Sequence, residues 1–491
     1  MSGIDPYGSS SSSDDEIITD EQEAAAVKAE IFADNTHFAR MVESGCGEHL
    51  LDLPLRFLPP GNVKDLHLDM VSGIGNSCDR PSYMTFLRAY KEFSNILKFR
   101  TKGDFQDCDT CAEKKQAIKT AKRAGYRELY KATMDLRQHY KEVTLSREIE
   151  ASLRRTPPSA AKPILLILTD GMDQAHWAIP RLPGWKAAKR FSNLARPKVI
   201  VQGVWCCWFG FHVILGDATQ PHDSSFIMEV LSRALEHIAS VSRRRQISVP
   251  EEICLWTDNT PRENKNRTVL MNLALLCGRG QFKSCTLANH IKGHSHNCLD
   301  QAFGCLARSF QYVDRLEDIY AVKRSIENIL SKDSLRSFLG VPEVSVEVLE
   351  GVRDWSGYAQ DLSVNLEGGM RDDATGIHCW MFMPRKDVPS TYNIAPVAGF
   401  APHPCDVVLL AKWYVWDSRL SQPPILVLPY ERAKGFVTRF PVPTKLRPPK
   451  TPENHAETWL KVAKALLDCY DLQQVQRSVQ YIRSLARGGA C

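Results

Sequence analysis

The chain has 491 residues and a mass of 55.3 kDa, enough for several domains with substantial cores. Hydrophobic residues make up 43% and charged residues 24% of the sequence, which excludes a mostly disordered chain, a collagen-like fibre and a coiled-coil rod. The formal net charge of +5 is too small to identify a nucleic-acid-binding protein by itself.

Residues 1–158 divide into two predicted parts. Residues 1–35 are rich in Ser and acidic residues and are predicted to be disordered. Residues 36–158 are predicted to be a mainly helical, basic segment, with apolar residues at spacings of three and four from residue 83 onwards. One long helix is expected after Cys111, followed by a Pro-containing linker.

The charge of this part of the chain is uneven. Residues 1–80 hold 5 basic and 15 acidic side chains, a net charge of −10. Residues 81–162 hold 18 basic and 10 acidic side chains, a net charge of +8. Such a basic segment is the electrostatic footprint expected where a protein binds a polyanion. A solvated helical surface explains the pattern equally well, so both interpretations stay open.

A pair of cysteines precedes the predicted long helix. Cys108 and Cys111 form a Cys-x-x-Cys pair, and His139 lies further along the helix. They provide three ligands for a structural zinc ion, which binds four side chains in a tetrahedron. The candidates for the fourth ligand are Cys46, His67 and Cys78. Buried free thiols and redox chemistry are the alternative interpretations.

The central segment, residues 159–345, alternates short apolar runs with helical patterns. The order is three strands, helix, strand, helix, strand and helix, at residues 164–168, 199–208, 211–215, 225–241, 253–256, 269–277, 284–287 and 298–310. This alternation predicts an α/β fold in which helices flank a mixed sheet. Residues 346–450 contain short β-like runs among many Pro and are predicted to be a small β-rich module, followed by helices over 451–491.

Acidic residues end two of the predicted strands. Asp170 ends the first strand, Asp258 ends the fourth, and Asp300 lies in the first turns of the last helix of the central segment. If the first and fourth strands are neighbours, the three carboxylates meet at one edge of the sheet. Carboxylates at close range repel one another unless hard cations such as Mg²⁺ or Mn²⁺ bind them. The alternative is that each Asp merely caps a turn or a helix.

Three sequence strings contain these acids, namely LTDGMDQAHWAIPR at 168–181, WTDNTPRENKNR at 256–267 and GHSHNCLDQAFG at 293–304. In this order they resemble a largely uncharacterised eukaryotic family of transposase-derived domains. That family has a ribonuclease H-like core of the transposase and integrase type. The resemblance extends over residues 80–430 and is strongest over residues 164–310.

The resemblance implies a reaction and its ligands. Asp170, Asp258 and Asp300 would bind two Mg²⁺ or Mn²⁺ ions, and Asp173 would either replace or supplement Asp170 as a ligand. Two such ions can activate a water or a 3′-hydroxyl for phosphodiester cleavage and strand transfer. An Asp in the third position is a shorter arm than the Glu of many transposases. The resemblance also supports zinc binding by the Cys pair and the downstream His.

Polar residues next to these acids are candidates for contact with DNA or a phosphate, namely Asn259, Asn264, Lys265, Asn266, His294 and His296. The block after Asp258 is expected to open a helix, whose free N–H groups favour an anion. A capped helix start and structural histidines are the alternative interpretation.

The leading hypothesis is therefore a transposon-derived, metal-dependent DNA-processing enzyme of the DDD type. Its expected partners are DNA and a second copy of itself, with no membrane and no small-molecule cofactor. The odd number of Cys, 15, the lack of an N-terminal signal pattern and three consecutive Arg at 243–245 favour the nucleus, or else the cytoplasm, over secretion. The alternative hypothesis is a catalytically inactive, domesticated transposase that acts as a DNA-binding or protein-interaction scaffold.

Overall fold

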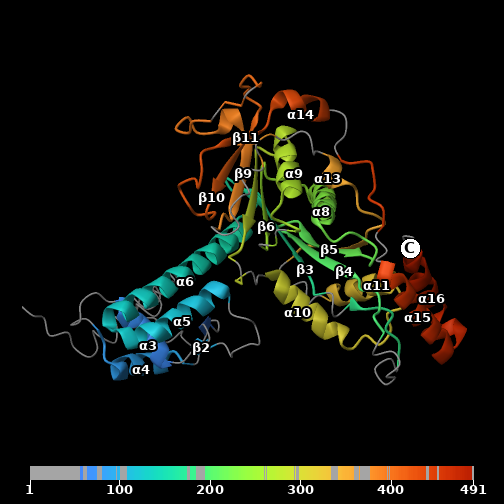
Figure 1. Ribbon diagram of the computed structural model, residues 1–491, viewed down its shortest axis with the longest axis horizontal. Helices are drawn as coiled ribbons and strands as arrows, with labels where there is room; N and C mark the ends of the chain where they lie inside the picture. Colours follow the sequence, from blue (N-terminus) through green and yellow to red (C-terminus); the bar gives the residue numbers. More distant parts are fainter. Residues whose placement is uncertain are drawn as a thin grey trace, which may run out of the picture. The chain divides into compact units, whose positions relative to one another are not determined.

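The structure is a computed structural model in which the chain divides into two units, Met1–Glu142 and Val143–Cys491 (Figure 1). It describes residues 56–58, 63–73, 80–94, 97–99, 108–173, 177–183, 194–258, 260, 262–291, 293–294, 298–332, 341–358, 364, 366, 376–394, 396–397, 399–437, 442–449 and 453–488. The predicted disordered segment 1–35 lies outside these residues, as do Cys46, Cys78, Asn259 and His296.

The first unit is helical, as predicted. Its described elements are β1 (Arg56–Leu58), α3 (Val63–Gly73), α4 (Tyr83–Glu92), β2 (Leu97–Phe99), α5 (Asp109–Ala124) and the first half of α6 (Tyr126–Arg155). The two short strands pair in parallel. Helix α4 begins after Ser82, whose hydroxyl accepts the Thr85 N–H at 3.2 Å, and Phe86 and Ala89 are buried on its inner face.

The long helix expected after Cys111 is two helices. Gly125 separates α5 from α6 and has a φ of +126°, a conformation that residues with a side chain rarely adopt. The prediction of one continuous helix was wrong. The helical spacing of apolar residues continues on both sides of Gly125, although α5 ends at this glycine. Exposed basic side chains occur along both helices, namely Lys119, Lys122, Arg123, Arg127, Lys131 and Lys141.

The second unit contains a mixed sheet of nine strands in the order β11-β10-β9-β7-β6-β3-β4-β5-β8. The strands are β3 (Ile164–Gly171), β4 (Ile200–Cys206), β5 (Gly210–Gly216), β6 (Glu252–Thr257), β7 (Ser284–Asn289), β8 (Val344–Val348), β9 (Cys379–Pro384), β10 (Val407–Lys412) and β11 (Ile425–Leu428). The first and fourth predicted strands, β3 and β6, are neighbours and run parallel. β7 is parallel to β6, whereas β4 is antiparallel to β3 and to β5.

Helices cover both faces of this sheet. Helices α8 (Ser224–Arg245) and α9 (Arg267–Gly278) pack on one face, and α10 (Cys298–Phe310) and α11 (Ile319–Leu330) on the other (Figure 1). Side chains of a strand alternate between its faces. Leu168, Trp256 and Ala288 therefore lie side by side in the α10 core, whereas the residues that precede them belong to the α8 and α9 core.

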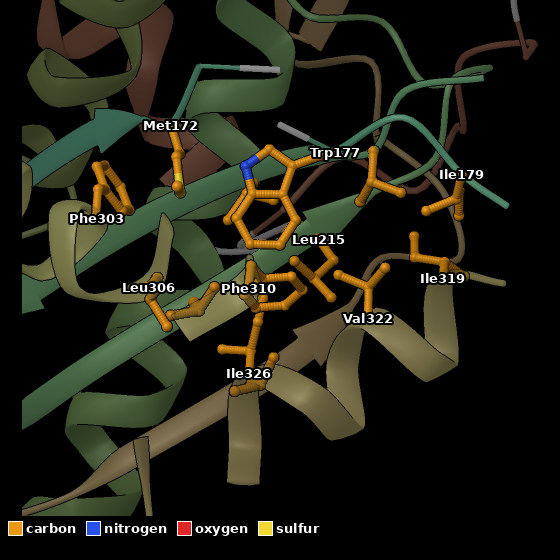
Figure 2. Packing of buried hydrophobic residues seen from close by; sticks show 14 of the residues in the cluster. Met172, Trp177, Ile179, Leu215, Phe303, Leu306, Phe310, Ile319, Val322 and Ile326 are labelled. Atoms are coloured by element: carbon orange, nitrogen blue, oxygen red, sulfur yellow. The ribbon is translucent and has the colours of Figure 1, made fainter. Parts of the chain in front are cut away.

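The packing of α10 fixes where Asp300 can lie. Figure 2 shows Phe303 and Phe310 of this helix among Met172, Trp177 and other apolar side chains. A Cβ at Gly203 of β4 would come within 2.8 Å of the Phe303 ring, so this glycine allows the helix to approach the sheet closely. Gly203 pairs with Asp170 near the end of β3, and Asp300 lies one helical turn before Phe303.

The predicted separate β-rich module is not separate. β9 pairs with β7, and β10 and β11 continue the central sheet beyond it, while β8 pairs with β5 at the opposite edge. Without these strands, β7 and β5 would present unpaired backbone N–H and C=O groups. The short elements of this part are α13 (Trp355–Tyr358), η6 (Arg385–Asp387) and α14 (Tyr430–Val437).

The chain continues into a pair of helices, α15 (Glu453–Cys469) and α16 (Leu472–Ala486), as predicted. They pack against each other and contribute Trp459, Leu466 and Ile482 to the core on the α10 face. None of the helices in the described part of the chain combines the length and the apolarity that crossing a bilayer requires.

Candidate functional site

Three neighbouring strands end in polar residues that share one face of the sheet. Asp170, Asp258 and His290, here called the edge row, each follow by two positions the in-register residues Leu168, Trp256 and Ala288. Because side chains alternate, the edge row projects on the α10 face. Neighbouring strands lie about 5 Å apart, which brings the side chains of adjacent members within reach of one another.

A cavity of about 380 Å³, here called the acid cavity, opens at this edge. It is lined by Asp170, Gly171, Met172, Asp173, Lys198, Ile200, Val201, His222, Asp258 and Glu263. The structure thus brings together three predicted metal ligands: Asp170, Asp173 and Asp258. Asp300 is not among the described residues that line the cavity.

The carboxylate of Asp258 is held by its neighbours. The Thr260 hydroxyl donates to one of its oxygens and the Asn264 amide to the other. Asn289 of β7 donates to the Asp258 carbonyl at 2.8 Å and to the Thr257 hydroxyl at 2.7 Å. These contacts orient the carboxylate and join the ends of β6 and β7.

Glu263 and His222 are cavity residues that were not predicted as site residues. The Glu263 Oε1 lies 3.5 Å from the His222 Nδ1. Burial raises the pKa of Glu263, His222 lowers it, and the negative charge of Asp258 raises it further. The lining of the acid cavity carries four carboxylates, those of Asp170, Asp173, Asp258 and Glu263, against Lys198 and His222. Glu263 lies in the polar block after Asp258, whereas no local pattern marks His222.

Asp300 is related to the same edge by its electrostatic effect on His290, the third member of the edge row. It lies half-buried in the first turn of α10, and its charge acts on the His290 ring. Burial, the main cause, and the Arg147 charge lower the pKa of His290 to about 4, while Asp300 opposes this. His290 is neutral near pH 7 and was missed in the sequence, although it follows its strand in the same way as Asp258 follows β6.

The polar block after Asp258 has partners inside the protein. Lys265 is only 8% exposed, and its Nζ lies 5.3 Å from the centre of the Trp380 ring. Asn266 opens α9 as expected, but its own side chain accepts the Val269 N–H at 3.2 Å. The Asn264 side chain is hydrogen-bonded to Asp258. These contacts agree with the alternative interpretation, in which the polar block is the capped start of a helix. His294 is half-buried, and its N–H donates to the Ile291 carbonyl at 2.9 Å.

The predicted zinc ligands of the first unit are brought together and buried. The Cys108 Sγ lies 3.3 Å from the His139 Nε2, and the ligand atoms of Cys108, Cys111 and His139 all lie within 4.8 Å of one another. Cys108 precedes α5, and its sulfur accepts the Cys111 N–H at 3.1 Å. Burial first, and then Cys108, raise the pKa of Cys111 to about 12. His67, a candidate fourth ligand, instead has its Nε2 2.9 Å from the Pro81 carbonyl.

Comparisons with known proteins gave matches to part of the chain. The family model of a domain of unknown function, DUF7869, matches residues 190–374, which include Asp258, His290 and Asp300 but not Asp170. No curated protein matches the chain. A solved Mos1 transposase paired-end complex with the left transposon end matches over 57% of this chain and 89% of that chain, at 13% identity and a TM-score of 0.26. A TM-score this low carries no argument about the fold.

Proposed function

We propose that this protein is a transposase-like, metal-dependent nuclease with a ribonuclease H-like core. The observation that carries the proposal is that Asp170 and Asp258, from strands far apart in the sequence, line one cavity at the edge of the sheet. The strand order β5-β4-β3-β6-β7, with antiparallel pairing before β3 and parallel pairing after it, is the order expected of that core and supports the proposal.

The residues at this edge fit divalent cations with oxygen ligands. Asp170 and Asp258 would hold them, with Asp173 and Asp300 as further ligands. The fit rests on the four carboxylates that line the acid cavity, Asp170, Asp173, Asp258 and Glu263, against Lys198 and His222. Bound cations would supply an activated oxygen nucleophile and stabilise the leaving oxygen. The chain's own task is to hold the carboxylates in place, which Thr260 and Asn264 do for Asp258.

DNA is the proposed substrate. Exposed Lys and Arg side chains along α5 and α6 offer contacts to phosphates, and Lys198 brings an exposed cation to the acid cavity. We propose that zinc stabilises the first unit through Cys108, Cys111 and His139. A nuclear location follows from a DNA substrate.

The test is Mn²⁺-dependent cleavage of end-labelled DNA. We expect Asp170→Asn and Asp258→Asn to lower the cleavage rate by more than about 100-fold, since even residues that only orient metal ligands cost 10- to 100-fold. Glu236→Gln is the matched control, because this carboxylate is exposed on α8 and should be dispensable. Cleavage that persists in both Asp variants would refute the assignment of these residues.

A catalytically inactive DNA-binding protein is the second candidate. It is favoured by the position of Asp300 outside the lining of the acid cavity. In that case the wild-type chain would bind DNA, as measured by fluorescence anisotropy, but would show no Mn²⁺ binding that depends on Asp258.

A further inference from the structure

His290 completes the edge row on the side of β7. Its backbone N–H donates to the Thr257 carbonyl at 3.3 Å, and its ring centre lies 5.4 Å from that of Trp256. Trp256 belongs to the α10 core, so the His290 ring lies on the same face as the carboxylates of Asp170 and Asp258. The two Asn289 hydrogen bonds fix the spacing between this strand end and that of Asp258.

The His290 ring is buried without the contacts that usually accompany burial. The residue is 2% exposed, and within the described part of the chain neither ring nitrogen has a hydrogen-bond partner. Buried polar side chains nearly always have such a partner, so an orphaned ring nitrogen in this position points to a ligand. The neutral ring offers a nitrogen lone pair, which is what a metal ion takes from histidine.

The charged groups around the ring come from several elements. Asp300 of α10 faces it with a negative charge, Arg147 of α6 with a positive charge, and His378 lies beside it before β9. Asp300 is thus the anionic group whose charge acts on the His290 ring, and Asp258 lies at the end of the neighbouring strand β6.

We propose that His290 is a nitrogen ligand of a divalent cation bound between Asp258 and Asp300. This inference rests on the proposed metal-dependent function and adds a ligand of a different chemical kind. Imidazole suits transition metals, whereas Mg²⁺ is a hard ion that favours oxygen ligands. The site should therefore bind Mn²⁺ more tightly than Mg²⁺, and the preference should depend on His290.

Pulsed electron paramagnetic resonance of the full chain loaded with zinc and then with Mn²⁺ tests this directly. A histidine ligand produces a nitrogen modulation of the Mn²⁺ signal, which ¹⁵N-labelling of histidine must change. We expect the modulation in the wild type and its loss in His290→Asn. Calorimetry should show Mn²⁺ binding weakened about 10- to 100-fold in this variant and Mg²⁺ binding changed less.

Two matched variants test whether a different histidine supplies the nitrogen. His212→Asn removes another buried histidine whose ring nitrogens lack hydrogen-bond partners among the described residues, but it lies beside Glu347, on the α8 face. His222→Asn removes the histidine that lines the acid cavity. The modulation should persist in both. Circular dichroism checks that each variant folds. If His290→Asn does not fold, the ¹⁵N-labelled wild type, compared with His212→Asn and His222→Asn, tests the assignment instead.

The outcomes separate the two proposals. If the wild type binds Mn²⁺ without a histidine modulation, or if the modulation disappears in His222→Asn instead, the assignment of His290 is wrong and the carboxylate site stands. If the wild type binds no Mn²⁺ that Asp258→Asn abolishes, the proposed function itself fails.

Discussion

Two regions of the second unit bury carboxylates, and they treat the charge in opposite ways. Glu229 of α8 is 0% exposed and accepts hydrogen bonds from the Arg353 guanidinium at 2.7 and 2.8 Å and from the Trp355 indole at 3.0 Å. Burial alone would raise the pKa of Glu229, but these donors outweigh it and the pKa is lowered. Glu263 in the acid cavity lies beside His222 and within reach of the Arg262 charge, but burial and the negative charge of Asp258 outweigh them, and its pKa is raised.

The difference distinguishes a structural ion pair from a candidate functional site. A buried charge that is fully paired contributes to the fold, because its desolvation is offset by its partners. The acid cavity instead gathers several carboxylates on one lining, which is the arrangement expected where a cationic ligand binds. The first unit extends the comparison to thiols, since burial, with the neighbouring Cys108, raises the pKa of Cys111 despite the opposing charge of Lys115.

The largest effect is expected at the thiols. If zinc binds Cys108, Cys111 and His139, purified protein should contain about one zinc ion per chain, and Cys108→Ser should contain none. The binding of structural zinc contributes about 10 kcal/mol or more to the folding free energy of small zinc domains. Chelation should therefore reduce the helical circular dichroism signal of residues 1–142. A metal-free wild type with unchanged helicity would contradict the site.

The fourth zinc ligand can be found with the same measurement. Zinc content is determined for Ala variants of Cys46, Cys78 and His67, with Cys405→Ala as the control because this thiol is exposed and lies outside the predicted set. Loss of zinc from one variant identifies the ligand.

The next largest effect is expected at the paired carboxylate. Arg353→Met leaves Glu229 buried without its main partner and should lower the free energy of unfolding by about 3–5 kcal/mol. Arg233→Met is the matched control, because Arg233 contacts the same carboxylate at 3.2 Å but is 36% exposed, and such pairs contribute about 1 kcal/mol or less. Urea unfolding measures both. Equal losses of unfolding free energy in the two variants would show that Arg353 stabilises the fold no more than Arg233 does.

The smallest effect is a difference in pH dependence. Glu229 has a lowered pKa in the folded state, so its contribution is present above its unfolded value of 4.5 and is lost as the pH falls through the folded pKa. Glu263 has a raised pKa, so it binds a proton more readily when folded, and its contribution is lost as the pH rises above 4.5 through the folded pKa.

The two Gln variants should therefore change the stability curve in opposite directions. Glu263→Gln should remove a decrease in stability above pH 4.5 and stabilise the metal-free protein at neutral pH by about 0.5–2 kcal/mol. Glu229→Gln should destabilise it at neutral pH. Denaturation midpoints across the pH range give the comparison, and parallel curves for both variants would show that the two carboxylates do not differ.

The order of strands and helices in the centre of the chain was predictable from the sequence. Apolar spacing is a local property, and the buried runs at 164–168 and 253–256 became β3 and β6. Asp170 and Asp258 could be singled out because each directly ends such a run. The Cys108–Cys111 pair was likewise visible, since its spacing at a helix start and a histidine on the following helix need only local geometry.

Tertiary structure alone decided which polar residues join these sites. His222 meets Glu263 only because the loop before α8 lies beside the end of β6, and His290 joins Asp258 only because β7 pairs with β6 in that register. The strands of residues 379–428 extend the central sheet for the same reason, because backbone pairing depends on which edge is open in space. Local sequence patterns determine the secondary structure of each segment, whereas long-range strand pairing determines which residues of other segments it contacts.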